Sequence, residues 1–425
     1  MKLLAHTSIL LLILMAGCKT SQKAPNQKPK NNSASPVAVA QTVASVVGIQ
    51  GKFMAKDSSF VTVFMRVEMF KSGSSVSMAE FTSRFTLNYV LYPDFASRER
   101  LAYGNLPLNN QSVSQVGFNI YMVRFDVKKP TNQSSAVMLA EFVEMGGTKK
   151  SLTELAIRFK NPKLSDRYTL FDKKGVQPLM RNYANVNDTL MIRNLAGSLK
   201  KMYLYYYDHS FDAAASPMNT GNRNTARTLN VDTVMQTMVG GPVVFRNEGL
   251  YYFVEDTTDA YGIGILVENK RFPKFTRPEE LIQPVLYVSQ NQEMAELNSA
   301  KQLKKALDKY WLTLLNGNTE AARRTIKSYY ERVEEANRLF TTYKEGWKTD
   351  KGMIHIVMGP PDKVIKAKDR EVWVYSQRAN FSEINFTFNR RPNQFVEDHY
   401  DLQRYIEYQP IWYPMVESWR SGIVK

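Results

Sequence analysis

Residues 346–362, Gly-Trp-Lys-Thr-Asp-Lys-Gly-Met-Ile-His-Ile-Val-Met-Gly-Pro-Pro-Asp, decide how the last part of the chain is organised. Gly346 follows a long charged helical pattern and is predicted to be its left-handed C′ residue. Thr349-Asp350-Lys351-Gly352 has the composition of a β-turn. The apolar run from Met353 to Met358 predicts a strand, which the Gly359-Pro360-Pro361-Asp362 turn ends.

This stretch resembles the signature of the GWxTD-domain family, known from Bacteroidetes-like bacteria. The four defining residues are present, and a Gly-x-Pro-Asp follows them. The matching positions are Gly346, Trp347, Thr349, Asp350, Gly352, Gly359, Pro361 and Asp362. The resemblance implies an envelope lipoprotein. It implies no catalytic residue and no cofactor, because no biochemical activity is established for the family.

The N-terminus has the features of a bacterial lipoprotein leader. Lys2 gives a basic start, Ser8 to Met15 is an apolar core too short to span a membrane, and Ala16-Gly17-Cys18 resembles a lipoprotein cleavage site. We therefore predict a signal peptide over residues 1–17 and lipidation of Cys18. Cys18 is the only cysteine in the chain, so internal disulfides are excluded.

Residues 18–45 are predicted to form a lipidated, flexible tether, because they are rich in Lys, Asn, Ser and Pro and poor in apolar residues. Acidic residues that would mark export to the cell surface do not follow Cys18. The prediction is an outer-membrane lipoprotein whose body faces the periplasm. Seven of the net sixteen positive charges precede the first acidic residue, Asp57. The remaining excess is spread thinly, which argues against a nucleic-acid partner and leaves the membrane and an envelope protein as expected partners.

The next two regions are β-rich. Val61, Val63, Met65, Val67 and Met69 alternate with other residues, the pattern of a half-buried strand. Several such runs separated by turns predict an antiparallel β-sandwich-like domain over residues 46–162 and a second over residues 163–290. Asp208 to Asn230 inside the second region is polar and predicts a long loop.

From Asn291 the apolar residues repeat with a helical period. The pattern predicts one helix up to Leu314, a stop at Asn316-Gly317-Asn318, and a second helix capped by Thr319. Residues 291–345 should therefore form a helical hairpin. Residues 346–425 should form a GWxTD module of α+β type, whose small antiparallel sheet contains 353–358, 372–375 and 384–388. The predicted fold class is multidomain, β-rich plus α+β.

Chemistry-bearing motifs are scarce. The chain has no Gly-x-Ser-x-Gly elbow, no phosphate loop and no His-x-x-x-His pair. Glu397-Asp398-His399-Tyr400-Asp401 could ligate a divalent cation, but a solvated acidic turn beside Arg390 and Arg391 is favoured. His355 is expected to hold one hydrogen bond at the edge of the core. We predict no catalytic, cofactor-binding or metal-binding residue.

The signature itself favours a structural interpretation. Asp350 and Asp362 could form a carboxylate pair for acid–base work, but each is explained by hydrogen bonds to turn backbone, and a loss of about 1 kcal/mol is expected on removing Asp350. Trp347 is expected to fill the junction of helix and sheet. The sequence thus favours a non-catalytic scaffold or binding role. The alternative is an envelope enzyme or glycan-binding protein acting on periplasmic peptide or polysaccharide.

Overall fold

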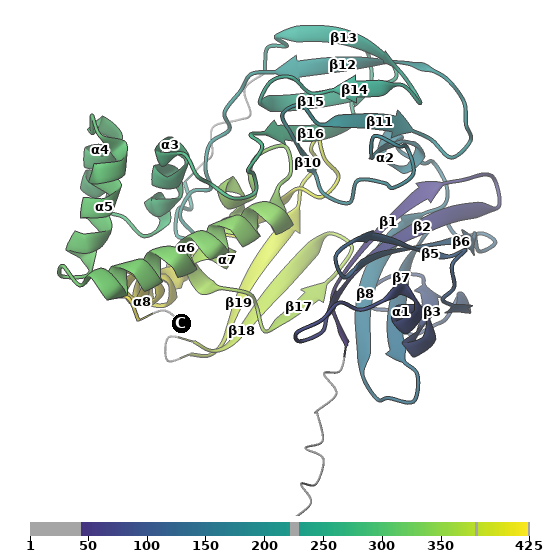
Figure 1. Cartoon of the computed structure of the whole chain (residues 1–425), viewed down its shortest axis with the longest axis horizontal. Helices are drawn as coiled ribbons and strands as arrows, with labels where there is room; N and C mark the ends of the chain where they lie inside the picture. Colours follow the sequence, from purple (N-terminus) through teal and green to yellow (C-terminus); the bar gives the residue numbers. More distant parts are fainter. Residues whose placement is uncertain (1–43, 222–228, 379–380, 424–425) are drawn as a thin grey trace, which may run out of the picture. The chain divides into compact units, whose positions relative to one another are not determined.

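The computed structural model describes residues 44–221, 229–378 and 381–423 (Figure 1). The predicted signal peptide, Cys18 and nearly all of the predicted tether lie outside these residues. The described residues belong to one compact unit. Among them, no helix combines the length and apolar content that crossing a membrane requires.

The first β-rich region forms a sandwich of two four-stranded antiparallel sheets, ordered β1-β2-β6-β5 and β4-β3-β7-β8. The predicted alternation in the second strand is confirmed, since Val61, Val63, Met65 and Val67 are fully buried between the sheets. The elements are β1 (Ser45–Ala55), β2 (Phe60–Phe70), α1 (Met78–Arg84), β3 (Phe85–Tyr92), β4 (Ala102–Pro107), β5 (Val113–Gly117), β6 (Ile120–Lys128), β7 (Ser135–Glu144) and β8 (Lys150–Arg158).

The second β-rich region also stacks two sheets, ordered β10-β16-β15-β12-β13 and β14-β11-β9, around one hydrophobic cluster. All pairs are antiparallel except β10 with β16. The elements are α2 (Leu164–Arg167), β9 (Thr169–Phe171), β10 (Tyr183–Asn185), β11 (Thr189–Arg193), β12 (Lys201–Tyr207), β13 (Thr233–Met238), β14 (Pro242–Val244), β15 (Gly249–Val254) and β16 (Ile263–Glu268). The β-rich fold class predicted from the sequence is confirmed.

The two β-rich regions pack against each other through the outer face of the β1-β2 sheet. Phe64 on β2 meets Phe171 on β9 edge to face, with ring centroids 6.3 Å apart. The Lys52 ammonium donates to the Leu179 carbonyl at 2.7 Å, and burial lowers the pKa of Lys52 to about 8. A strand region with both faces covered carries apolar residues on both, which is why β2 also buries Phe64 on its outward face.

The helical region differs in two details from the prediction. The expected single helix is broken after Ser299 into α4 and α5, because Ala300 to Gln302 leave the helical conformation. The cap of α6 is Asn318, whose Oδ1 accepts from the Ala321 N–H at 3.0 Å, and Thr319 is the first helical residue. The elements are α3 (Pro278–Ile282), the 3₁₀ turn η1 (Gln283–Tyr287), α4 (Asn291–Ser299), α5 (Leu303–Leu314) and α6 (Thr319–Phe340).

The predicted strand over residues 353–358 is wrong, because these residues form helix α7. Thr349 caps that helix by accepting from the Gly352 N–H at 3.0 Å. Every residue from Met353 to Met358 is buried, so the run carries no helical period that would distinguish it from a buried strand. The sheet of the module is therefore built without it.

The module has a four-stranded antiparallel sheet instead of the predicted three-stranded one. Its face toward α6 and α7 holds Trp373, Tyr375, Phe386 and Phe388, which share one core with both helices. Figure 1 shows α6 running across this sheet beside α7. The remaining elements are η2 (Gly346–Lys348), α7 (Asp350–Met358), β17 (Lys363–Lys366), β18 (Arg370–Arg378), β19 (Phe381–Arg390), β20 (Tyr400–Leu402), η3 (Ile406–Tyr408) and α8 (Gln409–Arg420).

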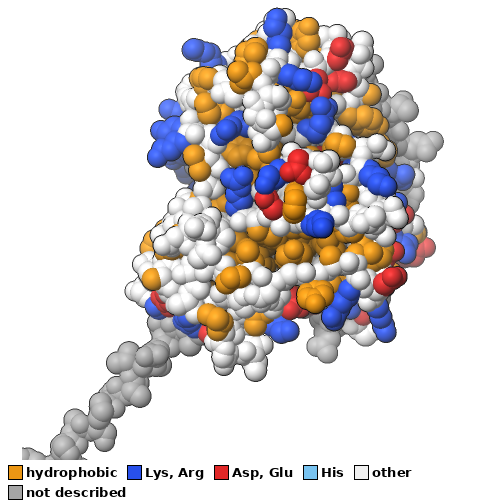
Figure 2. All heavy atoms as spheres, turned by 90° about the vertical axis from the view of Figure 1, so that its right-hand side faces the viewer, with side chains coloured by type: hydrophobic (Ala, Val, Ile, Leu, Met, Phe, Trp, Pro, Cys, Tyr) orange, Lys and Arg blue, Asp and Glu red, His pale blue; other side chains and the backbone are white. Residues whose placement is uncertain are grey.

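One face of the surface is drawn in Figure 2. Lys and Arg side chains are scattered over it among acidic and uncharged side chains, and hydrophobic side chains form a band across its middle. The positive net charge of the chain therefore does not gather into a single basic surface on this face.

Candidate functional site

The signature forms a corner between α6 and α7. After α6 ends at Phe340, the chain turns through η2 and starts α7 at Asp350. Thr349 closes this turn, because its hydroxyl donates to the Gly346 carbonyl at 2.7 Å while accepting from Gly352. We call residues 346–352 the signature corner.

Two glycines let backbones meet inside the signature corner. A Cβ at Gly346 would lie 2.0 Å from the Ala336 carbonyl oxygen, and one at Gly352 would lie 1.9 Å from the Gly346 carbonyl oxygen. Gly346 has no positive φ, so its interpretation as a left-handed C′ residue is wrong. The left-handed glycine of the signature is Gly359, with φ of 85° at the end of α7.

Gly352→Ala is expected to destabilise the fold although alanine favours helices. In a solvent-exposed helix, replacing Gly by Ala raises the free energy of unfolding by about 1 kcal/mol. Here the methyl group overlaps a carbonyl oxygen of the backbone, so the change should lower the free energy of unfolding by at least about 2 kcal/mol. Thermal unfolding followed by tryptophan fluorescence measures the effect, since all five tryptophans lie between residues 311 and 419. Gly48→Ala is the control, because its methyl group meets nothing closer than 3.6 Å. An unchanged midpoint in Gly352→Ala would contradict the close packing.

Trp347 is held in the core by its backbone as well as by its ring. Its N–H donates to the Asn337 side chain at 3.0 Å, and its carbonyl accepts from the Tyr287 hydroxyl at 2.8 Å. The indole is 3% exposed and meets the Tyr287 ring at 6.1 Å. Its Nε1 is buried without a hydrogen-bond partner. The ring thus contributes apolar area and shape rather than a hydrogen bond.

Asp350 is the most constrained charge of the signature corner. Its carboxylate forms two bonds with the Arg404 guanidinium, at 2.5 and 3.1 Å, and accepts from the Leu402 N–H at 2.7 Å. Both charged side chains are buried, at 4% and 9% exposure. The expectation that Asp350 serves only a local turn is therefore wrong: it joins the start of α7 to the segment after β20.

The loop after β12 also contacts the signature corner through basic side chains. Arg404 donates to the carbonyls of Ala215 and Ser216, at 3.1 and 3.2 Å. Lys348 donates to the Ser210 hydroxyl at 3.1 Å and pairs with Glu345 at 2.7 Å. The described part of this loop, residues 208–221, thus contacts both Lys348 of the signature corner and Arg404, the partner of Asp350, and we call it the strap.

The second half of the signature organises the sheet. The Asp362 carboxylate accepts from the Ser376 N–H at 2.7 Å, and its own N–H donates to the Val374 carbonyl at 3.0 Å. The Tyr375 hydroxyl donates to the Gly359 carbonyl at 2.8 Å. Asp362 and Asp350 therefore bind different segments: Asp362 binds β18, and Asp350 binds Leu402 and Arg404. Pro361 is partly exposed in the turn between them.

The histidines and acidic turn singled out in the sequence have local partners. His355 is buried, and its Nε2 lies 3.0 Å from a Glu335 carboxylate oxygen. Glu397 pairs with Lys163 at 2.8 Å, and Asp398 pairs with Arg390 at 3.2 Å. His399 Nε2 lies 3.5 Å from Asp401. The carboxylates at 397 and 398 thus meet basic side chains.

A perturbed carboxyl group lies near the signature corner. Burial, with repulsion from Glu345 and Glu248, raises the pKa of Glu268 to about 8, and attraction to Lys348 opposes this shift. A carboxyl group that holds its proton near neutral pH could act as a general acid. Sequence reasoning missed Glu268, because nothing around it on β16 distinguishes it from a surface residue.

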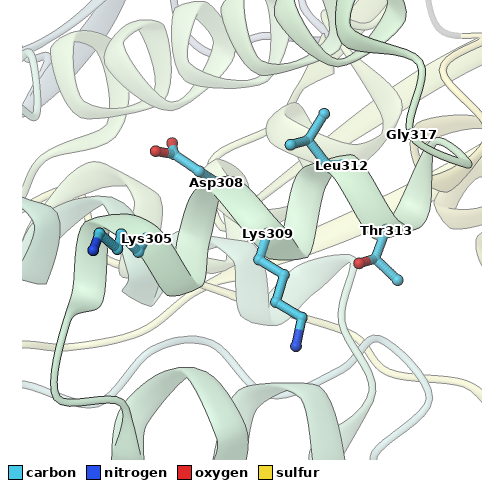
Figure 3. Close-up of a pocket in the computed structure, with 6 residues that line it drawn as sticks. All are labelled: Lys305, Asp308, Lys309, Leu312, Thr313 and Gly317. Carbon is cyan, nitrogen blue, oxygen red and sulfur yellow. The ribbon is translucent and has the colours of Figure 1, made fainter.

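A surface hollow lies elsewhere, along the solvent side of α5 (Figure 3). Its lining is mostly exposed, and its one carboxylate, on Asp308, pairs with Lys304 at 2.8 Å. None of the signature residues lines it. The residues that line it are Lys305, Asp308, Lys309, Leu312, Thr313 and Gly317.

Sequence reasoning also missed the partners that hold the signature corner. Tyr287 and Arg404 contact it from 60 and 54 positions away in the chain. Asn337 is the one partner that the sequence could have indicated, since it lies four residues after Val333 on the apolar stripe of α6. In the structure it is fully buried. A buried amide on such a stripe requires a specific hydrogen-bond partner.

Comparison with known proteins identifies the domain that contains this corner. A search of curated proteins gives no match. The family model described as the GWxTD domain matches residues 249–421, from the first residue of β15 to just beyond α8. The match therefore includes two central strands of the second β-rich region as well as the helices, the signature corner and the C-terminal sheet. Residues 249–421 of this chain are therefore a GWxTD domain.

Proposed function

We propose that this protein is a lipid-anchored, periplasm-facing component of the outer membrane with a non-catalytic scaffold or binding role. The observation that carries the proposal is the use of the signature's polar groups. Thr349 caps a helix, Asp350 binds Arg404 and a backbone N–H, and Asp362 binds a strand. Groups engaged in this way support the fold, whereas a catalytic carboxylate must be able to reach a substrate.

The scaffold interpretation is supported by the way the signature corner joins distant segments. It contacts α6, the strap, η1, the last residue of β20 and Arg404 just beyond it, and so ties the second β-rich region to the C-terminal sheet. A rigid junction of this kind would hold binding surfaces at fixed positions. The proposed partners are the membrane, through the lipid on Cys18, and another envelope protein, with no nucleic acid.

Cys18→Ser is expected to release the protein from the membrane fraction of cells. The reason is that Cys18 stands at the predicted cleavage site and is the only thiol available for lipidation. Cell fractionation with a high-salt wash, followed by thermal unfolding of the released protein, checks both location and folding. A folded Cys18→Ser variant that stays with the washed membranes would contradict the lipoprotein proposal.

The rival function, an envelope enzyme or glycan-binding protein, is favoured by the raised pKa of Glu268. Such an enzyme would use the protonated Glu268 carboxyl group as an acid close to the signature corner. Its activity should then be lost in Glu268→Gln, which keeps the shape of the side chain but removes the proton. A non-catalytic protein should keep its function in this variant.

The same variant has an expected effect on stability. Because the pKa of Glu268 rises from an ordinary 4.5 to about 8 on folding, only the folded chain holds this proton between those pH values. The stabilisation that comes from holding the Glu268 proton in the folded chain is complete below pH 4.5 and is lost as the pH rises to 8. Glu268→Gln should therefore gain in stability relative to wild type as the pH rises. Parallel unfolding midpoints from pH 5 to 8 in the two proteins would contradict the raised pKa.

A further inference from the structure

Four large apolar side chains are exposed at one end of the first sandwich. They are Val47, Phe70, Phe118 and Met145, with 61%, 58%, 76% and 54% of their surface exposed. Single exposed apolar residues are common on soluble proteins, but several from different segments at one place mark a contact surface. We call these four residues the apolar end.

The pairing of strands places three of these residues together. The first residue of β1 pairs with Phe70, the last residue of β2, and Val47 lies at a bulge two residues further along β1. The Met69 N–H donates to the Asn119 carbonyl at 2.8 Å, which brings the turn between β5 and β6 beside the end of β2. Phe118 is in that turn. Val47, Phe70 and Phe118 thus follow one another across the end of one sheet.

A chain of ion pairs connects Met145 to the same end. Lys71 binds Glu80 at 2.9 Å, Glu80 binds Arg84 at 3.1 Å, and Arg84 binds Glu144 at 2.5 Å. The Met145 N–H donates to the Arg84 carbonyl at 2.7 Å. The two positive and two negative charges of this chain neutralise one another, so the charged side chains beneath the apolar end carry no net charge. Paired charges lower the desolvation free energy that is needed to bring this end of the sandwich to a low-dielectric surface.

The chain itself indicates what covers this surface. β1 starts at Ser45, so residues 19–44, a spacer of 26 residues, connect Cys18 to this end of the sandwich. The sequence predicts a flexible tether here, and a flexible chain of that length has a typical end-to-end distance of about 30 Å. A lipid on Cys18 would keep the apolar end within that distance of the bilayer, at high effective concentration. The spacer also has four lysines and no acidic residue, which suits an anionic lipid surface.

We propose that the apolar end of the first sandwich contacts the bilayer to which Cys18 is attached, with Phe70 and Phe118 entering the interface between head groups and acyl chains. This inference rests on the proposed lipidation of Cys18. The contact is weak alone, because only two large side chains enter the interface, so the lipid supplies the anchoring and the apolar end sets the orientation. The C-terminal GWxTD domain then has a defined direction relative to the membrane.

Vesicle binding tests the contact without the lipid. The protein is purified without residues 1–17 and with Ser at position 18, which keeps every described residue, and is sedimented with phosphatidylethanolamine–phosphatidylglycerol vesicles. We expect measurable binding, reduced about tenfold by combining Phe70→Ser with Phe118→Ser. Tyr103→Ser should bind like the parent, because Tyr103 is 80% exposed but lies on β4, paired with Val90 near the opposite end of its sheet. Equal binding by all three proteins, or none by the parent, overturns the inference.

A second readout leaves the apolar residues intact. The parent lacks cysteine, so Ser74→Cys, in the turn that follows Phe70, or Tyr103→Cys gives one site for a polarity-sensitive fluorophore. The inference predicts a blue shift with vesicles for the label at 74 only. No shift at 74, or equal shifts at both sites, overturns it. Gel filtration tests whether a second copy of the chain covers the apolar end instead. If the parent is a dimer and the Phe70→Ser, Phe118→Ser variant is a monomer, the apolar end is a dimer interface and the membrane contact is wrong.

The two proposals fail separately. If Cys18→Ser leaves the cell membranes but the purified protein ignores vesicles, lipidation stands and the membrane contact of the apolar end is wrong. If the apolar end binds vesicles and Cys18→Ser still remains in washed membranes after Phe70→Ser and Phe118→Ser are added to it, the membrane contact stands and lipidation is wrong.

Discussion

Asp350→Ala is expected to lower the free energy of unfolding of the GWxTD domain by about 3–5 kcal/mol. The change removes one member of a buried ion pair and leaves the Arg404 guanidinium buried without its carboxylate. It also removes the acceptor of the Leu402 N–H. This loss is several times larger than the roughly 1 kcal/mol expected for a turn hydrogen bond alone. Urea unfolding followed by tryptophan fluorescence measures it.

Asp362→Ala is the matched control for Asp350→Ala. Asp362 is also a signature carboxylate, but it is exposed and accepts from the Ser376 N–H. Its removal should cost about 1 kcal/mol. Replacing Asp350 by Leu together with Arg404 by Met should cost less than Asp350→Ala, because no unpaired charge stays buried. Equal and small losses for both aspartates would contradict the constrained role of Asp350.

Trp347→Ala is expected to cost about 3–5 kcal/mol, because it removes a large buried side chain at the junction of α6, α7 and η1. Trp347→Phe should cost distinctly less, since the indole Nε1 has no hydrogen-bond partner to lose. The remaining four tryptophans report the unfolding of the same domain.

Tyr413→Ala provides the control for Trp347→Ala. Tyr413 is an aromatic residue of the same domain, but 57% of its surface is exposed on α8. Its removal should change stability by no more than about 0.5 kcal/mol. A Trp347→Ala variant as stable as Tyr413→Ala would contradict the packing role and indicate that the indole is kept for binding.

The periodic patterns of the sequence predicted much of the fold. Alternation over β2 and the helical stripe over α6 are set by one buried face, and a buried face leaves its period in the sequence. Helix α7 was predicted as a strand because it is buried on all sides and therefore shows an apolar run without a period. The signal that starts this helix is Thr349 as its cap, and Thr and Asp favour turns as well as helix starts, so the sequence alone does not separate the two.

The signature corner could be located from the sequence but not explained from it. Gly346 and Gly352 are glycines because other backbones approach them, and the sequence does not show which atoms are near. The sequence predicts only a turn hydrogen bond for Asp350, because its ion-pair partner, Arg404, is 54 positions away. Contacts of such long range arise only when the sheet and helices assemble, so local reasoning underestimated the cost of removing this carboxylate.

The measurement that tests the central claim most directly compares stability with function in Asp350→Asn. This change removes the charge that binds Arg404 and keeps nearly the same shape. The variant and wild type are compared by urea unfolding and by rescue of a deletion strain at reduced and normal growth temperature. If the signature is a structural corner, Asp350→Asn loses stability, and rescue recovers at the lower temperature where the variant stays folded. A variant as stable as wild type that fails to rescue at either temperature would contradict the account and make Asp350 part of a functional site.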